Sequence, residues 1–211
     1  MKPLPPLIHL DDAIIVADKP AGLLAVPGRG ADKADCLAAR VQAVHADAQV
    51  VHRLDMATSG LMLMARGADL QRQLSMAFAQ RRIDKVYVAV VDGLLADDAG
   101  EIDLPIGADW LQRPRRQVDR LAGKPSLTCW RVLGRDLAAG RTRLSLEPVT
   151  GRTHQLRVHL SAIGHAIVGD ALYASPDVAA AAPRLLLHAC HLSLEHPVQR
   201  TRCRFDSPAP F

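Results

Sequence analysis

The chain has 211 residues, of which 49% are hydrophobic and 23% are charged. This length and composition are typical of a globular protein that folds without disulfide or metal staples, and they exclude the collagen, coiled-coil and disordered classes. No apolar run approaches the ~20 residues that a membrane span requires, and the N-terminus lacks the apolar core of a secretory signal. We therefore expect one domain over residues 1–211, in a monomer.

The charge balance is mildly basic. Lys and Arg total 26 against 22 Asp and Glu, which gives a formal charge of +4, and most of the cations are arginines. Arginine binds phosphate in a bidentate manner and stacks on bases, so the balance is compatible with a polyanionic partner. A coding bias towards arginine explains it equally well. Aromatic residues make up only 3% of the chain, which disfavours a platform that stacks several bases.

The cysteines have no spacing that indicates a metal or redox site. They lie at Cys36, Cys129, Cys190 and Cys203. Zinc sites and redox pairs place two cysteines close together in the sequence, as in CxxC. We expect four reduced, mostly buried thiols in a cytoplasmic protein, and no metal site.

The hydrophobic pattern predicts strands and helices in mixed order. Strands are predicted at 13–17, 61–65, 85–91, 101–106, 127–133, 141–146, 185–187 and 192–194. Helices are predicted at 34–46, 69–80 and 153–163. Thr153 is the predicted N-cap of the last helix, and Gly164 the residue that ends it. Because the elements show no regular βαβ period, we expect an α+β fold with a mixed, largely antiparallel sheet.

The segment 51–60 carries two ionisable groups in a short loop before a predicted strand. Its sequence is VHRLDMATSG, in which Arg53 and Asp55 flank an apolar leucine. Catalytic groups gather in loops that a rigid scaffold holds. From the local sequence alone, Asp55 is a nucleophile, a general base or the cap of a turn.

The segment 147–160 collects polar side chains around the start of a predicted helix. They are Arg152, His154, Gln155, Arg157 and His159. The free N–H groups of a helix start favour an anion such as a phosphate. Leu156 and Leu160 face the core, so Arg157 can reach a neighbouring carboxylate from the flank. The alternative is a solvated basic face with two structural histidines.

Three further segments have both a structural and a functional interpretation. Tyr87, in the predicted strand 85–91, lies on the face opposite Val86 and Val88 and is either a core residue or a ring that stacks on one base. The segment 164–173 indicates a tight turn–strand–turn, and 183–189 a buried strand that ends in a polar group.

Taken together and in this order, the segments resemble the RluA-type pseudouridine synthases over about residues 7–211. The matching stretches are HRLDMATSG at 52–60, DKVYVAVVDG at 84–93, GRTHQLRVHL at 151–160, GHAIVGDALY at 164–173 and LLLHA at 185–189. The resemblance implies an α+β catalytic domain, with a mixed, mostly antiparallel sheet around a central cleft and flanking helices. It also implies that no S4-like domain precedes it.

The resemblance also assigns roles to residues. Asp55 is the implied catalytic carboxylate, Arg157 the cation that keeps it ionised, and Tyr87 the ring that stacks on the flipped uracil. Arg53 is implied to fill the space that the base leaves or to hold a phosphate, and Leu186 or Leu187 to line the base pocket. The candidates for contacts with the RNA backbone, most of which are equally well surface charges, are Arg29, Arg113, Arg115, Arg116, Arg152, His154 and Arg184.

The implied reaction converts uridine to pseudouridine in RNA. It needs no redox step and no external group, so no cofactor is expected. Motifs at 26–29, 52–60 and 173–176 resemble compact members that modify both 23S rRNA and the tRNA anticodon loop. The alternatives are a synthase that acts on rRNA only or on another RNA site, a catalytically silent RNA-binding relative, and a Ser-His-Asp hydrolase. The hydrolase is disfavoured because the chain has no GxSxG motif.

Overall fold

The computed structural model describes residues 2–28, 30 and 33–211. Its backbone groups into two compact units. The first comprises residues 1–85 and 188–210, and the second comprises residues 86–187 and 211. Each unit contains strands and helices, as expected of an α+β fold.

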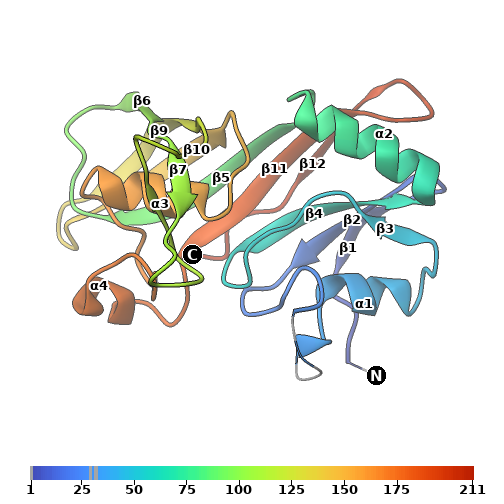
Figure 1. Ribbon diagram of the computed structural model, residues 1–211, viewed down its shortest axis with the longest axis horizontal. Coiled ribbons are helices and arrows are strands. Elements are labelled where there is room, and N and C mark those ends of the chain that lie inside the picture. The colour runs from blue at the N-terminus through green and yellow to red at the C-terminus, as the bar shows by residue number, and fades with distance from the viewer. Residues whose placement is uncertain (1, 29, 31–32) are drawn as a thin grey trace. The chain divides into compact units, whose positions relative to one another are not determined.

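The first unit is a mixed sheet between two helices (Figure 1). Its strands are β1 (Leu7–Leu10), β2 (Ile14–Lys19), β3 (Ala48–Val50), β4 (Ser59–Arg66), β11 (Leu187–Glu195) and β12 (Arg202–Asp206). The β4 strand is antiparallel to β2 and β3 and parallel to β11, and β12 is antiparallel to β11. The helices are α1 (Leu37–Gln42) and α2 (Ala68–Ala79).

The β4 strand is buried on both faces, which explains its continuous apolar sequence. Leu61 and Leu63 pack in a cluster with Leu74 of α2, whereas Met62 and Met64 pack in a second cluster with Leu37 of α1. Successive side chains of a strand point to opposite faces, so a strand covered on both sides needs apolar residues at every position.

The close approach of β4 and β11 requires a glycine near the start of β4. Gly60 has a φ of +112°, and a Cβ atom built on it would lie 2.3 Å from the carbonyl oxygen of Ala189 in β11. Residues with a side chain rarely adopt this φ, and no side chain fits the gap. Gly60 therefore lets β11 pair with β4 directly after the loop that carries Asp55.

The second unit contains an antiparallel sheet with strand order β5-β10-β9-β6. The strands are β5 (Asp84–Asp92), β6 (Ala99–Asp103), β9 (Leu127–Asp136) and β10 (Arg141–Pro148). A separate hairpin pairs β7 (Ile106–Ala108) with β8 (Arg116–Val118), and the helices are α3 (Gln155–Ala162) and α4 (Pro176–Ala180).

Hydrogen bonds of a buried histidine tie α3 to the strands of this unit. His159 is fully buried. Its Nδ1 atom lies 2.9 Å from the hydroxyl of Thr128 in β9, and its Nε2 atom lies 2.9 Å from the carbonyl oxygen of Leu104. Both ring nitrogens are thus satisfied, and desolvation lowers the pKa of His159 below its usual value. This residue is structural, which is the alternative that the sequence left open.

Most predicted elements are present, and the exceptions have local causes. Residues 101–106 form two strands because Pro105 has no N–H to continue the ladder. Residues 164–173 hold only an isolated bridge at Ile167. The helix predicted at 34–46 ends at Gln42, and Val44 beyond it is 54% exposed. The cysteines are free thiols, but only Cys36 is buried, and the other three are partly exposed.

The predicted N-cap Thr153 is wrong. The cap of α3 is His154, which has a left-handed φ of 57° and no side-chain cap bond. The side chain of Gln155 closes the preceding turn instead, since its Oε1 atom accepts hydrogen bonds from the hydroxyl of Thr150 at 2.7 Å and from the N–H of Arg152 at 3.0 Å. The predicted end at Gly164 is confirmed by its φ of +84°.

We expect Gly60→Ala to lower the free energy of unfolding by about 2–4 kcal/mol, because the new methyl group adds both a strained φ and an overlap with β11. Gly134→Ala in β9 is the matched control, since no atom lies within 4 Å of its Cβ position. Chemical denaturation of both variants measures the effect. Equal stabilities of the two variants would show that β11 moves away from β4 without cost.

Candidate active site

The loop that carries Asp55 lies between β3 and β4 in the first unit. Leu54 is only 6% exposed and anchors the loop in the protein. Asp55 is partly exposed and Arg53 is exposed. The carbonyl oxygen of Asp55 accepts a hydrogen bond from the N–H of Thr58 at 3.1 Å, which closes a turn. The loop therefore carries two charged side chains, and its backbone is held by the buried Leu54 and by the turn that ends at Thr58.

A buried lysine holds the loop immediately after Asp55. Lys19, the last residue of β2, is 0% exposed. Its ammonium donates hydrogen bonds to the carbonyl oxygens of Leu23 at 2.7 Å, Pro20 at 2.9 Å and Met56 at 3.1 Å. An ammonium has three N–H donors, and burying it is costly unless they are bonded. The sequence predicted a strand at 13–17 but gave no signal for this contact of Lys19.

A neutral histidine holds the loop on its other side. His52 Nε2 accepts a hydrogen bond from the N–H of Leu63 in β4 at 2.9 Å, and its ring lies 4.5 Å from the ring of Phe78 in α2. Burial, followed by the charge of Lys85, lowers the pKa of His52 to about 3. The imidazole is therefore neutral at pH 7, with its proton on Nδ1.

A hydrogen-bonded network underlies the end of the loop. Ser59 Oγ lies 2.8 Å from His188 Nδ1, and His188 Nε2 lies 3.1 Å from Ser207 Oγ, which donates to Asp18 at 2.7 Å. The network contains a Ser, a His and an Asp, but Ser59 and His188 are 3% and 2% exposed. A nucleophile must reach its substrate, so this buried network supports the strands and does not indicate a hydrolase.

In the second unit, Arg157 forms a buried ion pair with Asp170. The Nε and Nη2 atoms of Arg157 donate to the two carboxylate oxygens at 2.8 and 2.6 Å. Asp170 Oδ1 also accepts the N–H groups of Leu172 at 2.9 Å and Tyr173 at 3.2 Å. The side chains of the pair are 5% and 0% exposed. Such a bidentate, fully bonded geometry is what a buried charge pair requires.

The sequence predicted that Arg157 reaches a carboxylate, and the structure identifies Asp170 as one. Asp170 itself was not predicted, because the segment 164–173 indicated only a tight turn–strand–turn. Gly169 makes that turn with a φ of +79°, and its Cβ position lies 1.9 Å from the carbonyl oxygen of Arg184. The pairing of Arg157 with Asp55 would join the two units, and it stays a prediction.

Tyr173 connects Arg157 to predicted RNA-binding residues. Its hydroxyl lies 2.7 Å from His154 Nδ1 and accepts the backbone N–H of Arg116 at 2.8 Å. The guanidinium carbons of Arg157 and Arg115 lie 5.1 and 5.4 Å from the centre of its ring. The structure thus brings four predicted site residues to one tyrosine, which the sequence analysis did not single out.

Tyr87 lies on the sheet of the second unit. It pairs with Leu146 of β10, and the residues that follow on the same face, Ala89 and Val91, are fully buried. Tyr87 itself is partly exposed. The carbonyl oxygen of Leu186 accepts a hydrogen bond from the N–H of Val90 in β5 at 3.1 Å, and its N–H donates to the carbonyl oxygen of Val168 at 2.9 Å. Leu187 is 3% exposed, so of the two candidate pocket leucines Leu186 is the more accessible.

The remaining predicted residues lie on exposed or partly exposed parts of the second unit. Arg152 donates to the carbonyl oxygen of Pro125 at 3.3 Å through Nε and Nη2. Arg113 is exposed, and Arg115 and Arg116 are partly exposed. Arg29 lies outside the described residues. In the ranges 2–28, 30 and 33–211, no group of three acidic, histidine or cysteine side chains is placed to hold a metal ion.

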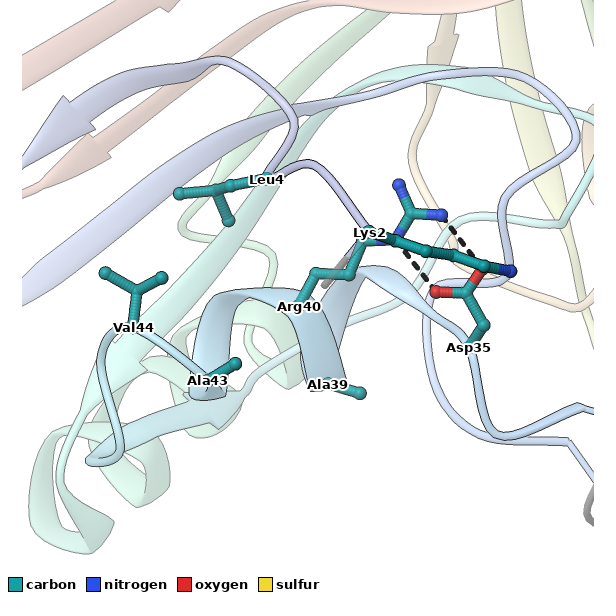
Figure 2. A pocket seen from close by; sticks show the side chains of 7 residues that line it. All are labelled: Lys2, Leu4, Asp35, Ala39, Arg40, Ala43 and Val44. Carbon is teal, nitrogen blue, oxygen red and sulfur yellow. Dashed lines mark hydrogen bonds and ion pairs between the residues drawn. The ribbon is translucent and has the colours of Figure 1, made fainter.

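A hollow of about 320 Å³ beside α1 contains none of these residues (Figure 2). It is lined by Lys2, Leu4, Asp35, Ala39, Arg40, Ala43 and Val44. Asp35 accepts hydrogen bonds from Arg40 at 2.8 Å and from Lys2 at 2.9 Å, and these bonds hold the pKa of its carboxyl well below the usual range. The charged groups of the hollow are thus bonded to one another, and it is not the candidate site.

The chain belongs to the RNA pseudouridylate synthase family, whose family model matches residues 13–162. Within that family it is an RluA-type RNA pseudouridine synthase, an isomerase. It is 45% identical over 206 residues to the dual-specificity RNA pseudouridine synthase RluA of Escherichia coli K12, covering 97% of this chain and 93% of that one. The RluA of Yersinia pestis is 45% identical over 205 residues, covering 97% and 99%.

A solved structure agrees with this family. The human RNA pseudouridylate synthase domain containing 1 superposes with a TM-score of 0.81 at 28% identity, covering 97% of this chain and 83% of that one. The predicted fold class, a mixed and mostly antiparallel sheet with a few helices, is therefore confirmed. Among the described residues, no helix has the length and apolar character that crossing a membrane demands.

We expect acid to destabilise the protein through His52. Its folded pKa of about 3 lies below the ordinary 6.5, so only the unfolded chain takes up this proton as the pH falls below 6.5. The contribution is fully present above pH 6.5 and declines by up to about 1.4 kcal/mol per pH unit below it. His52→Gln keeps an acceptor but does not titrate. Denaturation at pH 7, 6 and 5 should therefore show a shallower decline for the variant, and parallel declines would contradict the assignment.

We expect Asp170→Asn to lower the free energy of unfolding by about 3–5 kcal/mol, because it removes the carboxylate that bonds the buried guanidinium of Arg157 through both of its oxygens. Asp177→Asn, at an exposed position in α4, is the matched control. Urea denaturation of both variants compares them. A loss below about 1 kcal/mol for Asp170→Asn would show that the pair is not a structural requirement.

Proposed function

We propose that this enzyme isomerises specific uridines in 23S rRNA and in the tRNA anticodon loop, with Asp55 as the catalytic carboxylate. The catalytic assignment rests on how the backbone of the Asp55 loop is held in place. The residues on either side of Asp55 are fixed by His52 and by the buried ammonium of Lys19, while Asp55 itself is partly exposed. A catalytic carboxylate needs this combination of a rigid backbone and access to substrate.

The reaction balances within the nucleotide. The N1–C1′ glycosidic bond breaks, the uracil turns, and a C5–C1′ bond forms, while the hydrogen leaves C5 and N1 gains one. No atom enters or leaves, so a single ionised carboxylate beside the ribose suffices. It acts either by attack on C1′ or by removal of a ribose proton. We assign this role to Asp55, and both routes require its negative charge.

Arg157 is the proposed cationic partner of Asp55. A guanidinium has five N–H donors, so the Asp170 carboxylate on its Nε and Nη2 edge leaves donors for a second acceptor. Two carboxylates on one guanidinium would keep both charges satisfied in a dry site. In this proposal Asp170 fixes the direction in which Arg157 points, and Arg157 keeps Asp55 ionised.

Tyr87 and Leu186 are the proposed walls of the base site. The phenol ring is partly exposed at the end of a buried sheet face, and an aromatic ring stacks on any base that leaves its helix. Arg53, which is exposed beside Asp55, is the proposed group that fills the vacated position or binds a phosphate. Arg115, Arg116, Arg152 and His154 are the proposed backbone contacts.

The dual specificity is proposed from similarity. The relatives from E. coli and Y. pestis are named dual-specificity enzymes, and the identity of 45% extends over 97% of this chain. The cysteines that the structure describes are free thiols, which fits a reducing compartment, and we propose the cytoplasm and a monomeric enzyme.

We expect Asp55→Asn to reduce pseudouridine formation by about 10³-fold or more, because the amide has no negative charge to stabilise the reacting ribose. Tritium release from RNA labelled at C5 of uridine measures the reaction on two substrates, a 23S rRNA fragment and a tRNA. The wild type should release tritium from both. Asp12→Asn, a fully exposed position in the same unit, is the control and should match the wild type.

Filter binding of the same RNAs separates catalysis from affinity, and the variant should still bind both. An active Asp55→Asn enzyme would refute the catalytic assignment. A wild type that modifies only the rRNA fragment would refute dual specificity and leave the catalytic assignment intact.

A further inference from the structure

We propose that Trp110 and Arg113 form a stacking site for one unpaired nucleobase of the RNA substrate, separate from the residues assigned to catalysis. Both residues lie in the turn between β7 and β8, within the second unit. The proposal rests on RNA as the substrate and adds a second point at which the enzyme holds it.

The turn exposes the largest side chain of the chain to solvent. Trp110 is 71% exposed, and Leu111 beside it is 97% exposed. Tryptophan is usually buried or engaged with a partner because its ring offers so much apolar area. The other tryptophan, Trp130 in β9, is partly buried. The exposed indole in the turn between β7 and β8 is therefore well placed to bind a ligand.

The turn is ordered by its own hydrogen bonds. Asp109 Oδ1 accepts the N–H groups of Leu111 at 3.1 Å and Gln112 at 3.0 Å. The N–H of Asp109 donates to the carbonyl oxygen of Arg115 at 3.2 Å, and Arg115 also bonds the side chain of Gln112 at 2.7 Å. The indole is thus presented from a closed turn, so its binding costs little conformational entropy.

Arg113 supports one face of the indole. Its guanidinium carbon lies 4.3 Å from the centre of the Trp110 ring, a cation–π distance. With Trp110 71% exposed, a flat ligand has access to the remaining surface of the ring. A nucleobase is flat, and aromatic stacking accepts every base because each has a π-face.

The charge of the hairpin favours a polyanion. Residues 106–124 contain five cations, at 113, 115, 116, 120 and 124, against the carboxylates of Asp109 and Asp119. Both carboxylates already accept backbone N–H groups. Phosphate oxygens are the acceptors that match such an excess of donors.

These observations favour a nucleotide over an apolar protein surface. A protein partner for Trp110 and Leu111 would need a contiguous apolar patch, whereas here the exposed ring is next to arginines. A ring and cations side by side are the combination that binds single-stranded RNA. An unpaired base therefore stacks on Trp110, and the adjacent arginines bind the phosphates on either side of that nucleotide.

Fluorescence tests the site directly. The chain has two tryptophans, so Trp130→Phe makes Trp110 the single reporter. The probes are a synthetic RNA hairpin with an unpaired loop and a blunt RNA duplex of the same base composition. Stacking should quench Trp110 emission with the hairpin and leave it nearly unchanged with the duplex. Absence of quenching at RNA concentrations that saturate binding would overturn the proposal.

Affinity tests it independently. Trp110→Ala should weaken binding of the hairpin by about 5- to 150-fold, the range of one base–aromatic stack, while Trp110→Phe recovers most of the loss. The salt dependence of binding should be the same for Trp110→Ala and the wild type, because no charge is removed. Leu121→Ala, at a side chain that is fully exposed in the next turn, is the control for apolar surface and should bind as the wild type.

Two outcomes would overturn the stacking site: a Trp110→Ala enzyme with wild-type affinity, or equal losses for Trp110→Ala and Trp110→Phe. Tritium release by the wild type is measured in parallel. If the wild type releases tritium but shows no quenching, the stacking site fails and the proposed function stands. If quenching occurs without tritium release, the proposed function fails and the stacking site stands.

Discussion

The ammonium of Lys19 is the interaction on which the Asp55 loop depends most directly. It is buried and donates to three carbonyl oxygens, and one of these belongs to Met56, the residue after Asp55. Breaking the hydrogen bond between a buried cation and a carbonyl oxygen costs free energy, because water does not readily replace either partner. The loop therefore favours one backbone conformation. The backbone next to Asp55, the proposed catalytic residue, is thus positioned by a buried charge. His52 provides the matching constraint before Asp55 through a neutral ring, and no second cation is needed there.

In the second unit, a buried arginine must have its charge compensated inside the protein. Asp170 compensates the charge of Arg157, and its Oδ1 atom is itself stabilised by two backbone N–H groups of the turn that Gly169 makes. The direction of the guanidinium is therefore set by backbone geometry, not by a flexible partner. An arginine that is oriented in advance loses less entropy when it binds a further acceptor, which is what the proposed pairing with Asp55 requires.

Local pattern predicted the elements well, and it failed where the decisive contact comes from a distant residue. The run Leu61–Ala65 predicted a strand, and the structure shows why it is apolar throughout: its side chains pack towards α1 on one face and α2 on the other. The N-cap of α3 was misplaced because the side chain of Gln155 competes for the turn, a choice that no single-residue preference contains. Asp55, Tyr87 and Arg157 were predicted from the resemblance of whole motifs in order, whereas Lys19 was not singled out and Asp170 and Tyr173 lay in a predicted turn–strand–turn. Their roles depend on partners that lie up to 57 positions away in the sequence, as in the bond from Arg116 to Tyr173.

Tyr173 links Arg157 to residues of the second unit that are proposed to bind RNA. Its hydroxyl accepts the N–H of Arg116 at the start of β8 and contacts His154 at the start of α3, and the guanidinium of Arg157 lies against its ring. Through Tyr173, the hairpin that carries Trp110 is therefore linked to the start of α3, the helix that carries Arg157. These hydrogen bonds are short and partly buried, and such bonds contribute more than an exposed ion pair. The enzyme can thus hold flanking nucleotides on a projecting turn without loosening the arginine, since both are fixed to one phenol.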